Sequence, residues 1–282
     1  MRKVISIAST PVTVASPYDN LAYIRKLMLK HDISRVVIVE GDKPVGIVTK
    51  TDIVKNITSI AYAKNPRALD EILAEEVMSK KLIVISRNQD VRRAAELMLK
   101  HGISSLPVVN SEGKLLGIVT KTDVTRFYAE TYKGEKLVKD VMSAPPITIG
   151  PNYPITHAIH LMLQNGISRL LVVEGGKLIG IITKTDLSFV ELNFGPQIRR
   201  RKFVKEVEVV QARRKIVRSY VVPLVSDLMT EDPVCTYEDQ DLASAASKMI
   251  DLGVSGLPVL DRNDKVVGVV TKTDVVKAVA SP

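Results

Sequence analysis

A threonine and an aspartate, three residues apart, occur four times along the chain, each time after a short apolar run that begins with glycine. The four stretches read GIVTKTD, GIVTKTD, GIITKTD and GVVTKTD. A hydroxyl, a carboxylate and free backbone amides at one helix start can bind a sugar diol beside a phosphate. We therefore predict a sugar- and phosphate-binding role for these pairs. The residues are Thr49 and Asp52, Thr120 and Asp123, Thr183 and Asp186, and Thr271 and Asp274.

A structural role explains part of the same pattern. The β-branched pair before each threonine predicts a buried strand, and the threonine then stands where a helix N-cap is expected. An aspartate at the third helical position would complete a capping box, and a threonine cap stabilises a helix by about 0.5–2 kcal/mol. Capping alone would also accept serine or asparagine, would prefer glutamate, and would require neither the lysine nor the second threonine. Both interpretations stay open, and recurrence of the whole motif favours binding.

Each motif closes a unit with the order β-α-β-β-α. In the first unit a strand follows a proline turn, and Leu21, Ile24 and Met28 then lie on one face of a helix. Two strands, 36–39 and 45–48, lead from this helix into the motif. The other three units repeat the order, which predicts an α/β (α+β) fold built from four repeats.

The composition limits the class of protein. The chain has 282 residues, of which 45% are hydrophobic and only 4% aromatic, so we expect aliphatic cores. Units of about 60–70 residues bury too little surface to be stable alone, so they should pair. The single cysteine, Cys235, excludes an internal disulfide and suits a reducing cytoplasm. No apolar run is long enough to predict a signal peptide or a membrane span, and we expect a cytoplasmic protein.

Most of the positive charge lies in one segment. Residues 188–226 hold nine basic and three acidic side chains, which gives +6 of the net charge of +9. Residues 203–209 alternate in polarity, as a strand would. The segment is either a solvated surface insertion or a docking or nucleic-acid-binding surface. The basic stretch 199–220 contains two aromatic residues, Phe203 and Tyr220, which are few for a surface that stacks bases.

The unit and its repeated ending resemble the CBS (cystathionine-β-synthase) domain. The resemblance places repeats at 1–60, 70–131, 134–192 and 220–282, with a basic insertion at 193–219. CBS domains pair through their sheets into Bateman modules, and two modules can form a disc, as in the γ subunit of AMP-activated protein kinase. We therefore expect repeat 1 to pair with repeat 2, repeat 3 to pair with repeat 4, and the two modules to close into a pseudo-symmetric disc.

The resemblance also implies where an adenosine ligand would lie. The aspartate of each motif would hold the ribose hydroxyls, with the first threonine assisting. The base would stack against the first strand of the same repeat, and the stretch after the first helix would line its far side. The implied base-contacting residues are Thr13, Val84, Thr148 and Cys235 on the first strands, and Ser34, Ser104, Ser168 and Ser255 after the helices.

One position after that serine alternates between arginine and a small residue: Arg35, Ser105, Arg169 and Gly256. In the family, a basic residue at this position contacts the phosphate of a nucleotide held by the partner repeat. The planar guanidinium of arginine suits this role because it meets phosphate oxygens bidentately. The alternative is a pair of solvated surface arginines. We expect Arg35 to serve the motif of repeat 2, and Arg169 that of repeat 4.

CBS proteins generally bind adenosine-containing ligands and report them to a partner protein. The resemblance therefore implies a regulatory sensor that binds AMP, ADP or ATP without turnover, with no catalytic cofactor and no metal. S-adenosylmethionine is a further possible ligand. An enzyme is disfavoured because the sequence offers no Ser-His-Asp set, metal cluster or Walker loop. The alternative is a nucleic-acid-binding or partner-docking protein that uses residues 199–218, gated by the same ligand.

Overall fold

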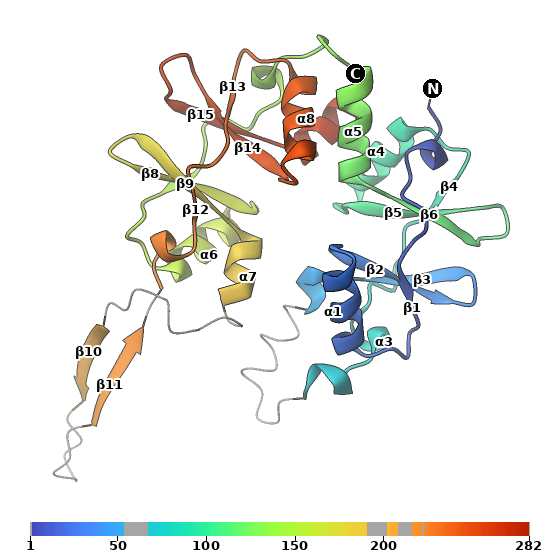
Figure 1. Ribbon diagram of the computed structural model, residues 1–282, viewed down its shortest axis with the longest axis horizontal. Coiled ribbons are helices and arrows are strands. Elements are labelled where there is room, and N and C mark those ends of the chain that lie inside the picture. The colour runs from blue at the N-terminus through green and yellow to red at the C-terminus, as the bar shows by residue number, and fades with distance from the viewer. Residues whose placement is uncertain (1, 54–66, 191–201, 208–215, 222, 282) are drawn as a thin grey trace. The chain divides into compact units, whose positions relative to one another are not determined.

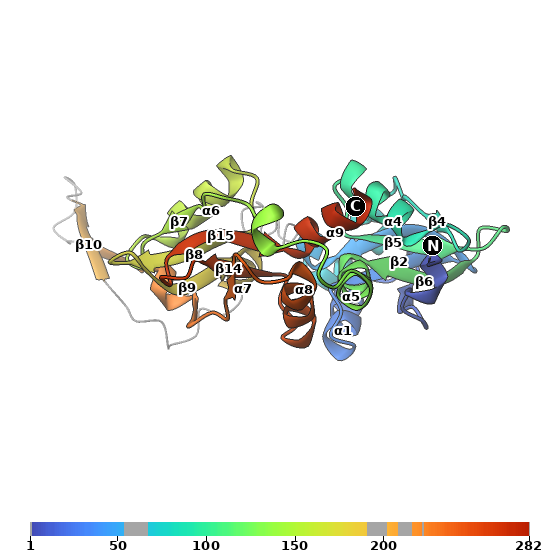
Figure 2. The same ribbon diagram turned by 90° about the horizontal axis from the view of Figure 1, so that it is seen from above.

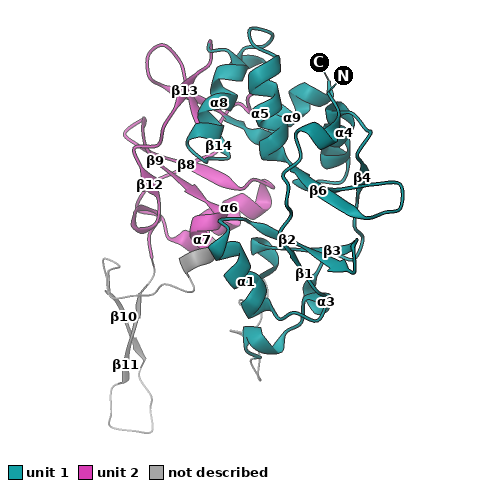
Figure 3. Ribbon diagram, turned by 45° about the vertical axis from the view of Figure 1, so that its right-hand side comes forward, with its two compact units in different colours: residues 1–141, 240–256, 270–282 teal, residues 142–239, 257–269 magenta. Residues whose placement is uncertain are grey.

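The computed structural model describes residues 2–53, 67–190, 202–207, 216–221 and 223–281 (Figure 1). These residues form two compact units (Figure 3). Unit 1 comprises residues 1–141, 240–256 and 270–282, and unit 2 comprises residues 142–239 and 257–269. The fourth repeat is divided, because its helices belong to unit 1 and most of its strand residues belong to unit 2.

All four repeats have the predicted order. Repeat 1 contains β1 (Val14–Ala15), α1 (Leu21–Lys30), β2 (Arg35–Glu40) and β3 (Lys43–Thr49), followed by the start of a helix at Lys50. Repeat 2 contains β4 (Ile85–Ser86), α4 (Val91–Lys100), β5 (Ser105–Val109), β6 (Leu115–Thr120) and α5 (Lys121–Thr131). Repeat 3 contains β7 (Thr148–Ile149), α6 (Ile155–Gln164), β8 (Arg169–Glu174), β9 (Lys177–Thr183) and α7 (Lys184–Val190). Repeat 4 contains β13 (Thr236–Tyr237), α8 (Leu242–Asp251), β14 (Gly256–Leu260), β15 (Val266–Thr271) and α9 (Lys272–Ala280). The predicted α/β class is confirmed.

Each repeat forms a small sheet in which the first strand lies parallel to the second. In repeat 1, Val14 of β1 pairs with Val37 of β2, and Ile38 of β2 pairs with Gly46 of the antiparallel β3. Short parallel strands β4, β7 and β13 pair in the same way with β5, β8 and β14. The last strand of each sheet runs directly into the motif helix, so the sheet fixes where that helix starts.

The apolar face predicted for the first helix of each repeat is buried in a local core. Leu21, Ile24 and Met28 of α1 are almost fully buried against strand residues of the same repeat, among them Ile38 and Val48. The predicted methionines of the other repeats are buried too, since Met98, Met162 and Met249 are at most 1% exposed. Burying such a side chain contributes about 1.5–3 kcal/mol. These methionines therefore fill the cores.

The segment that precedes each repeat crosses the sheet of another repeat. Ser9, ahead of repeat 1, bridges Ile118 in β6 of repeat 2, and Ser79, ahead of β4, donates to the carbonyl of Ile47 in β3. In unit 2, Ser143 bridges Val269 in β15, and β12 (Thr230–Glu231) pairs with β9. This reciprocal exchange confirms that repeat 1 pairs with repeat 2 and that repeat 3 pairs with repeat 4. The closed disc stays a prediction.

The exchange explains the glycine that opens each motif. A Cβ on Gly46 would overlap the thioether of Met78, and a Cβ on Gly180 or Gly268 would lie 2.6 Å from the sulfur of Met229 or Met142. At Gly117 the nearest atom would be Cγ2 of Thr10, at 3.1 Å. Each of these neighbours belongs to the crossing segment of the paired repeat, so the glycine makes room for it.

We expect Gly46→Ala to destabilise unit 1, because the added methyl group displaces the Met78 side chain from the β3 surface. Overpacking of this kind costs about 1–3 kcal/mol. The measurement is thermal unfolding of the variant beside the wild type. A second substitution, Met78→Ala, should recover part of the loss, because it removes the overlapping atoms. An unchanged melting temperature in Gly46→Ala would contradict the close crossing.

Helices of repeats 2 and 4 pack together in unit 1. Helix α5 lies against both α8 and α9, and α4 lies against α9 (Figure 1, Figure 2). Val124 and Tyr128 of α5 and Val275 and Val276 of α9 are at most 1% exposed. The starts of α5 and α9, which carry the motifs of repeats 2 and 4, are thus held in one core.

The basic insertion contains an antiparallel hairpin of β10 (Lys202–Val207) and β11 (Ile216–Val221). The strand predicted at 203–209 is therefore present over its first part, and residues 208–209 lie outside the described residues. Arg199, Arg200, Arg201, Arg213, Arg214 and Lys215 also lie outside them. A docking or nucleic-acid role for this segment stays a prediction. None of the helices in the described part of the chain has the length and apolarity needed to cross a bilayer.

Candidate functional site

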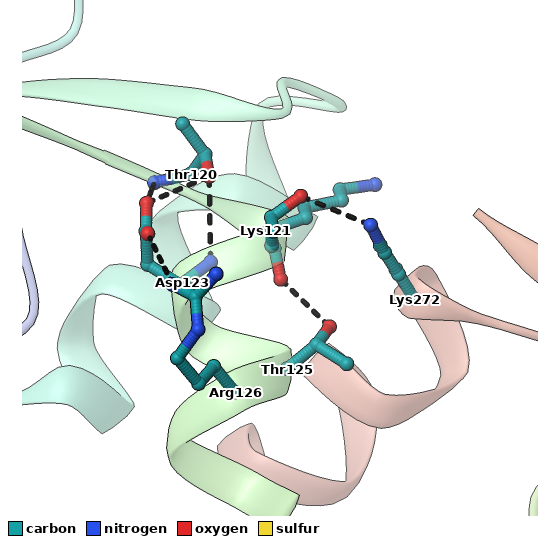
Figure 4. A network of polar contacts seen from close by, with 7 residues as sticks. Thr120, Lys121, Asp123, Thr125, Arg126 and Lys272 are labelled. Atoms are coloured by element: carbon teal, nitrogen blue, oxygen red, sulfur yellow. Dashed lines mark hydrogen bonds and ion pairs between the residues drawn. The ribbon is translucent and has the colours of Figure 1, made fainter. Parts of the chain in front are cut away.

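The motif threonine and aspartate form a capping box in every repeat. In repeat 2, Oδ2 of Asp123 accepts from the backbone N–H of Thr120 at 2.8 Å and from its hydroxyl at 2.7 Å (Figure 4). The backbone N–H of Asp123 points back to the Thr120 hydroxyl at 3.4 Å. The same three contacts occur at the other three motifs. The structural interpretation of the motif is therefore confirmed.

Capping uses only one oxygen of each aspartate. The other oxygen of Asp123 accepts from Arg126 at 3.3 Å, and that of Asp274 accepts from Lys277 at 2.9 Å. A carboxylate oxygen has more than one acceptor position, so Oδ1 can still accept from a ligand hydroxyl. Asp123 and Asp274 are only 5% and 3% exposed, so they would meet a ligand in a largely dehydrated setting. Capping and ribose binding are thus compatible.

Two pockets of similar size lie in unit 1, one beside each motif of the first repeat pair. The first, which we call pocket A, has a volume of about 250 Å³. It is lined by Ser9, Pro11, Val12, Thr13, Asp32, Ile33, Ser34, Arg35, Val37, Ile118, Thr120 and Thr122. The second, pocket B, has a volume of about 260 Å³. It is lined by Ile47, Thr49, Thr51, Asp52, Ser79, Lys81, Leu82, Ile83, Gly102, Ile103, Ser104 and Ser105.

Each pocket combines the motif of one repeat with the opening residues of the other. Thr13, expected beside the motif of its own repeat, instead lies in pocket A with Thr120. Pocket B likewise joins Thr49 and Asp52 to residues 81–83, and Val84 is not among its lining residues. The segment exchange is the physical reason, because each repeat crosses its partner's third strand before it enters its own sheet. Ser34 of repeat 1 likewise lines pocket A with the motif of repeat 2, and Ser104 of repeat 2 lines pocket B with the motif of repeat 1.

Arg35 lines pocket A together with Thr120 of the repeat 2 motif. Its Nη1 donates to the carbonyl of Ser104 at 2.9 Å, and its Nη2 donates to the hydroxyl of Ser34 at 3.0 Å. Burial lowers the pKa of Arg35, and the Asp123 carboxylate opposes that shift. At the equivalent place in pocket B stands Ser105, which is 7% exposed and carries no charge.

The sites predicted for repeats 3 and 4 are distributed over both units. Thr148, Ser168, Arg169, Thr183, Asp186 and Cys235 belong to unit 2, whereas Ser255, Thr271 and Asp274 belong to unit 1. That Arg169 contacts the phosphate of a ligand held by the motif of repeat 4 therefore stays a prediction. The Cys235 thiol donates to the carbonyl of Pro233 at 3.1 Å. Among the described residues, no group of three or more His, Cys, Asp or Glu side chains could hold a metal ion.

Two lysines of the motif have a role that the sequence did not predict. Nζ of Lys121 donates to the Thr273 hydroxyl at 2.9 Å, and Nζ of Lys272 donates to the Thr122 hydroxyl at 3.1 Å. Burial lowers the pKa of Lys121; Asp274 opposes this shift, while Lys277 and Arg35 add to it. The sequence did indicate that the lysine and the second threonine have a role beyond capping, because capping requires neither of them and both occur in all four motifs.

The repeated fold and its paired pockets define a class of protein. A family model described as the CBS domain matches residues 4–59, 74–130, 138–192 and 225–281. The chain therefore belongs to the CBS-domain family, and the predicted resemblance is confirmed.

Particular relatives extend the comparison. Protein MJ1225 of Methanocaldococcus jannaschii is 27% identical over 253 residues, which cover 86% of this chain and 85% of that protein. Its crystal structure, described as a candidate archaeal homologue of γ-AMPK, has a TM-score of 0.76 at 24% identity and covers 98% of this chain and 99% of that one. A conserved protein from Pyrococcus horikoshii has a TM-score of 0.67 at 19% identity, covering 99% of this chain and all of that one (100%). These two likenesses show the fold.

Part of the chain is also similar to an enzyme. The inosine-5'-monophosphate dehydrogenase of Korarchaeum cryptofilum is 34% identical over 197 residues, which cover 67% of this chain but only 38% of the enzyme.

Proposed function

We propose that the chain is a regulatory protein that binds AMP-, ADP- or ATP-type ligands, with S-adenosylmethionine as a further candidate, in pockets A and B without turning them over. The observation that carries the proposal is the composition of pocket A, where apolar strand residues, an arginine and two threonines of the repeat 2 motif, Thr120 and Thr122, converge. Val12, Val37 and Ile118 offer an apolar surface, and Arg35 and the backbone amides at the start of α5 offer positive charge.

Each part of a nucleotide has a matching group in or beside pocket A. The apolar residues suit a flat base. Oδ1 of Asp123, which caps the helix start that carries the lining residues Thr120 and Thr122, suits a ribose hydroxyl. Arg35, together with backbone amides at the start of α5, suits a phosphate. Ligand pockets generally range over about 300–1,000 Å³, so a cavity of about 250 Å³ suits one mononucleotide better than a dinucleotide.

A regulator also needs a partner to which it reports. We propose that the basic insertion, 193–219, is the docking surface for a partner protein, with nucleic acid as the alternative occupant. Binding to nucleic acid that weakens steeply as salt rises would favour the alternative.

We expect AMP, ADP, ATP or S-adenosylmethionine to raise the melting temperature at physiological salt. A ligand at a hundred times its dissociation constant stabilises the folded state by about 2.7 kcal/mol per site, which corresponds to several degrees for a domain pair of this size. Inorganic phosphate at the same concentration is the control for a general anion effect on a basic protein. Mass spectrometry of ligand that copurifies with the chain would identify the native compound. No shift with any of the four compounds would contradict the proposed function.

A further inference from the structure

A pair of reciprocal hydrogen bonds joins the motifs of repeats 2 and 4. Lys121, the first residue of α5, donates to Thr273 of α9, and Lys272, the first residue of α9, donates to Thr122 of α5. Figure 4 shows Lys272 extending from the start of α9 towards the start of α5. The bonds are 2.9 and 3.1 Å long and lie within unit 1.

One of these bonds ends at the wall of pocket A. Thr122 lines that pocket, and its hydroxyl accepts from Lys272 at 3.1 Å. A hydroxyl can accept one hydrogen bond and donate another, so Thr122 keeps a proton to donate. The ammonium of Lys272 therefore lies one hydrogen bond away from a residue that lines the pocket, although Lys272 belongs to neither repeat of the first pair.

We propose that Lys272 is a specificity-determining residue for pocket A, where its ammonium binds the phosphate of the adenosine compound and favours charged ligands over adenosine. The inference rests on the proposed function. It adds a residue of repeat 4 to a pocket that is built by repeats 1 and 2.

The local charges support this role. Lys272 donates to a neutral hydroxyl, and a charge-assisted bond to a phosphate oxygen would be roughly twice as strong. Asp123 and Asp274 are held by Arg126 and Lys277 in addition to their capping contacts. Burial lowers the pKa of Lys121, the Asp274 carboxylate opposes this shift, and Lys277 and Arg35 add to it. Several cations therefore lie around the starts of the two helices, and a bound phosphate would be attracted to them.

The test compares AMP and adenosine binding by calorimetry in the full chain. Lys272→Met keeps the aliphatic stem and removes the charge. It should weaken AMP binding at the pocket A site about tenfold, while adenosine binding changes less than about twofold. Lys272→Arg should retain most of the AMP affinity because it keeps the charge. The matched control is Lys26→Met, which removes the same charge from an exposed position on α1 outside pocket A. The melting temperature of each variant without ligand reports any loss of folding.

Three results would overturn the inference. Equal losses of AMP and adenosine affinity in Lys272→Met would show that the lysine stabilises the packing of α5 against α9 and does not bind the phosphate. Unchanged AMP affinity in the same variant would show that the ammonium does not reach the phosphate. If the wild-type chain binds none of the adenosine compounds, the proposed function fails and this inference fails with it. The first two results leave the proposed function standing, so the failures are distinguishable.

Discussion

Arg35→Ala should weaken AMP binding at pocket A by roughly ten- to a hundredfold and leave adenosine binding nearly unchanged. Arg35 lines the pocket together with Thr120 and Thr122 of the repeat 2 motif, so it is placed to meet a phosphate beside the ribose. A hydrogen bond to a charged group is worth about 1.5–3 kcal/mol, and each 1.4 kcal/mol corresponds to about a factor of ten in affinity. Calorimetry with AMP and with adenosine separates the phosphate contribution from the rest of the ligand.

The control for this prediction is Arg25→Ala, which removes the same charge from an exposed position of α1 outside pocket A. Arg35→Lys should fall between the wild type and Arg35→Ala, because an ammonium keeps the charge but lacks the planar fork. Pocket B has Ser105 where pocket A has Arg35, so its phosphate affinity should already be the weaker of the two. If Arg35→Ala weakened AMP and adenosine equally, the arginine would serve the fold of the pocket rather than the phosphate.

The fold was predictable because its signal is local and repeated. Apolar residues at helical spacing predicted α1 and its buried face, and the threonine and aspartate three positions apart predicted the capping box at the start of α5. Four copies of one order made each assignment support the others. Pairing of repeats 1 and 2 followed from their small size and the family resemblance.

What the sequence did not predict depends on contacts between distant residues. Ser9 bridges Ile118 through backbone hydrogen bonds. Almost any residue type can form such bonds, so the sequence does not reveal them. The glycine that opens each motif is needed for that crossing, but a glycine is equally typical of a turn, so it did not predict the crossing. Lys272 and Thr122 are 150 residues apart, so no local pattern relates the lysine to the hydroxyl. Thr13, predicted to serve the motif of its own repeat, lines a pocket with Thr120 of repeat 2 for the same reason, since the exchange of segments is a property of the pair.

Asp123→Ala should remove binding of AMP and adenosine alike at pocket A, by at least about tenfold for each. The substitution deletes the acceptor proposed for the ribose hydroxyls, which both ligands share, and a bond to a charged acceptor is worth about 1.5–3 kcal/mol. It also deletes the capping contacts to Thr120, which should lower the stability of α5 by about 0.5–2 kcal/mol. The affinity loss must therefore be separated from the stability loss.

A matched variant makes that separation. Asp140 accepts from the backbone N–H of Leu137 at 2.8 Å, as Asp123 does from that of Thr120, and it lies in the same unit, but neither Asp140 nor Leu137 lines pocket A. Asp140→Ala should therefore lower the melting temperature without changing either affinity. Thr120→Ser should keep both stability and binding, because serine caps as well as threonine does. Retained adenosine affinity in Asp123→Ala would show that this carboxylate only caps α5. Loss of the tight AMP site in Asp52→Ala, with Asp123→Ala unaffected, would move the phosphate-binding site to pocket B and leave Arg35 without its proposed ligand.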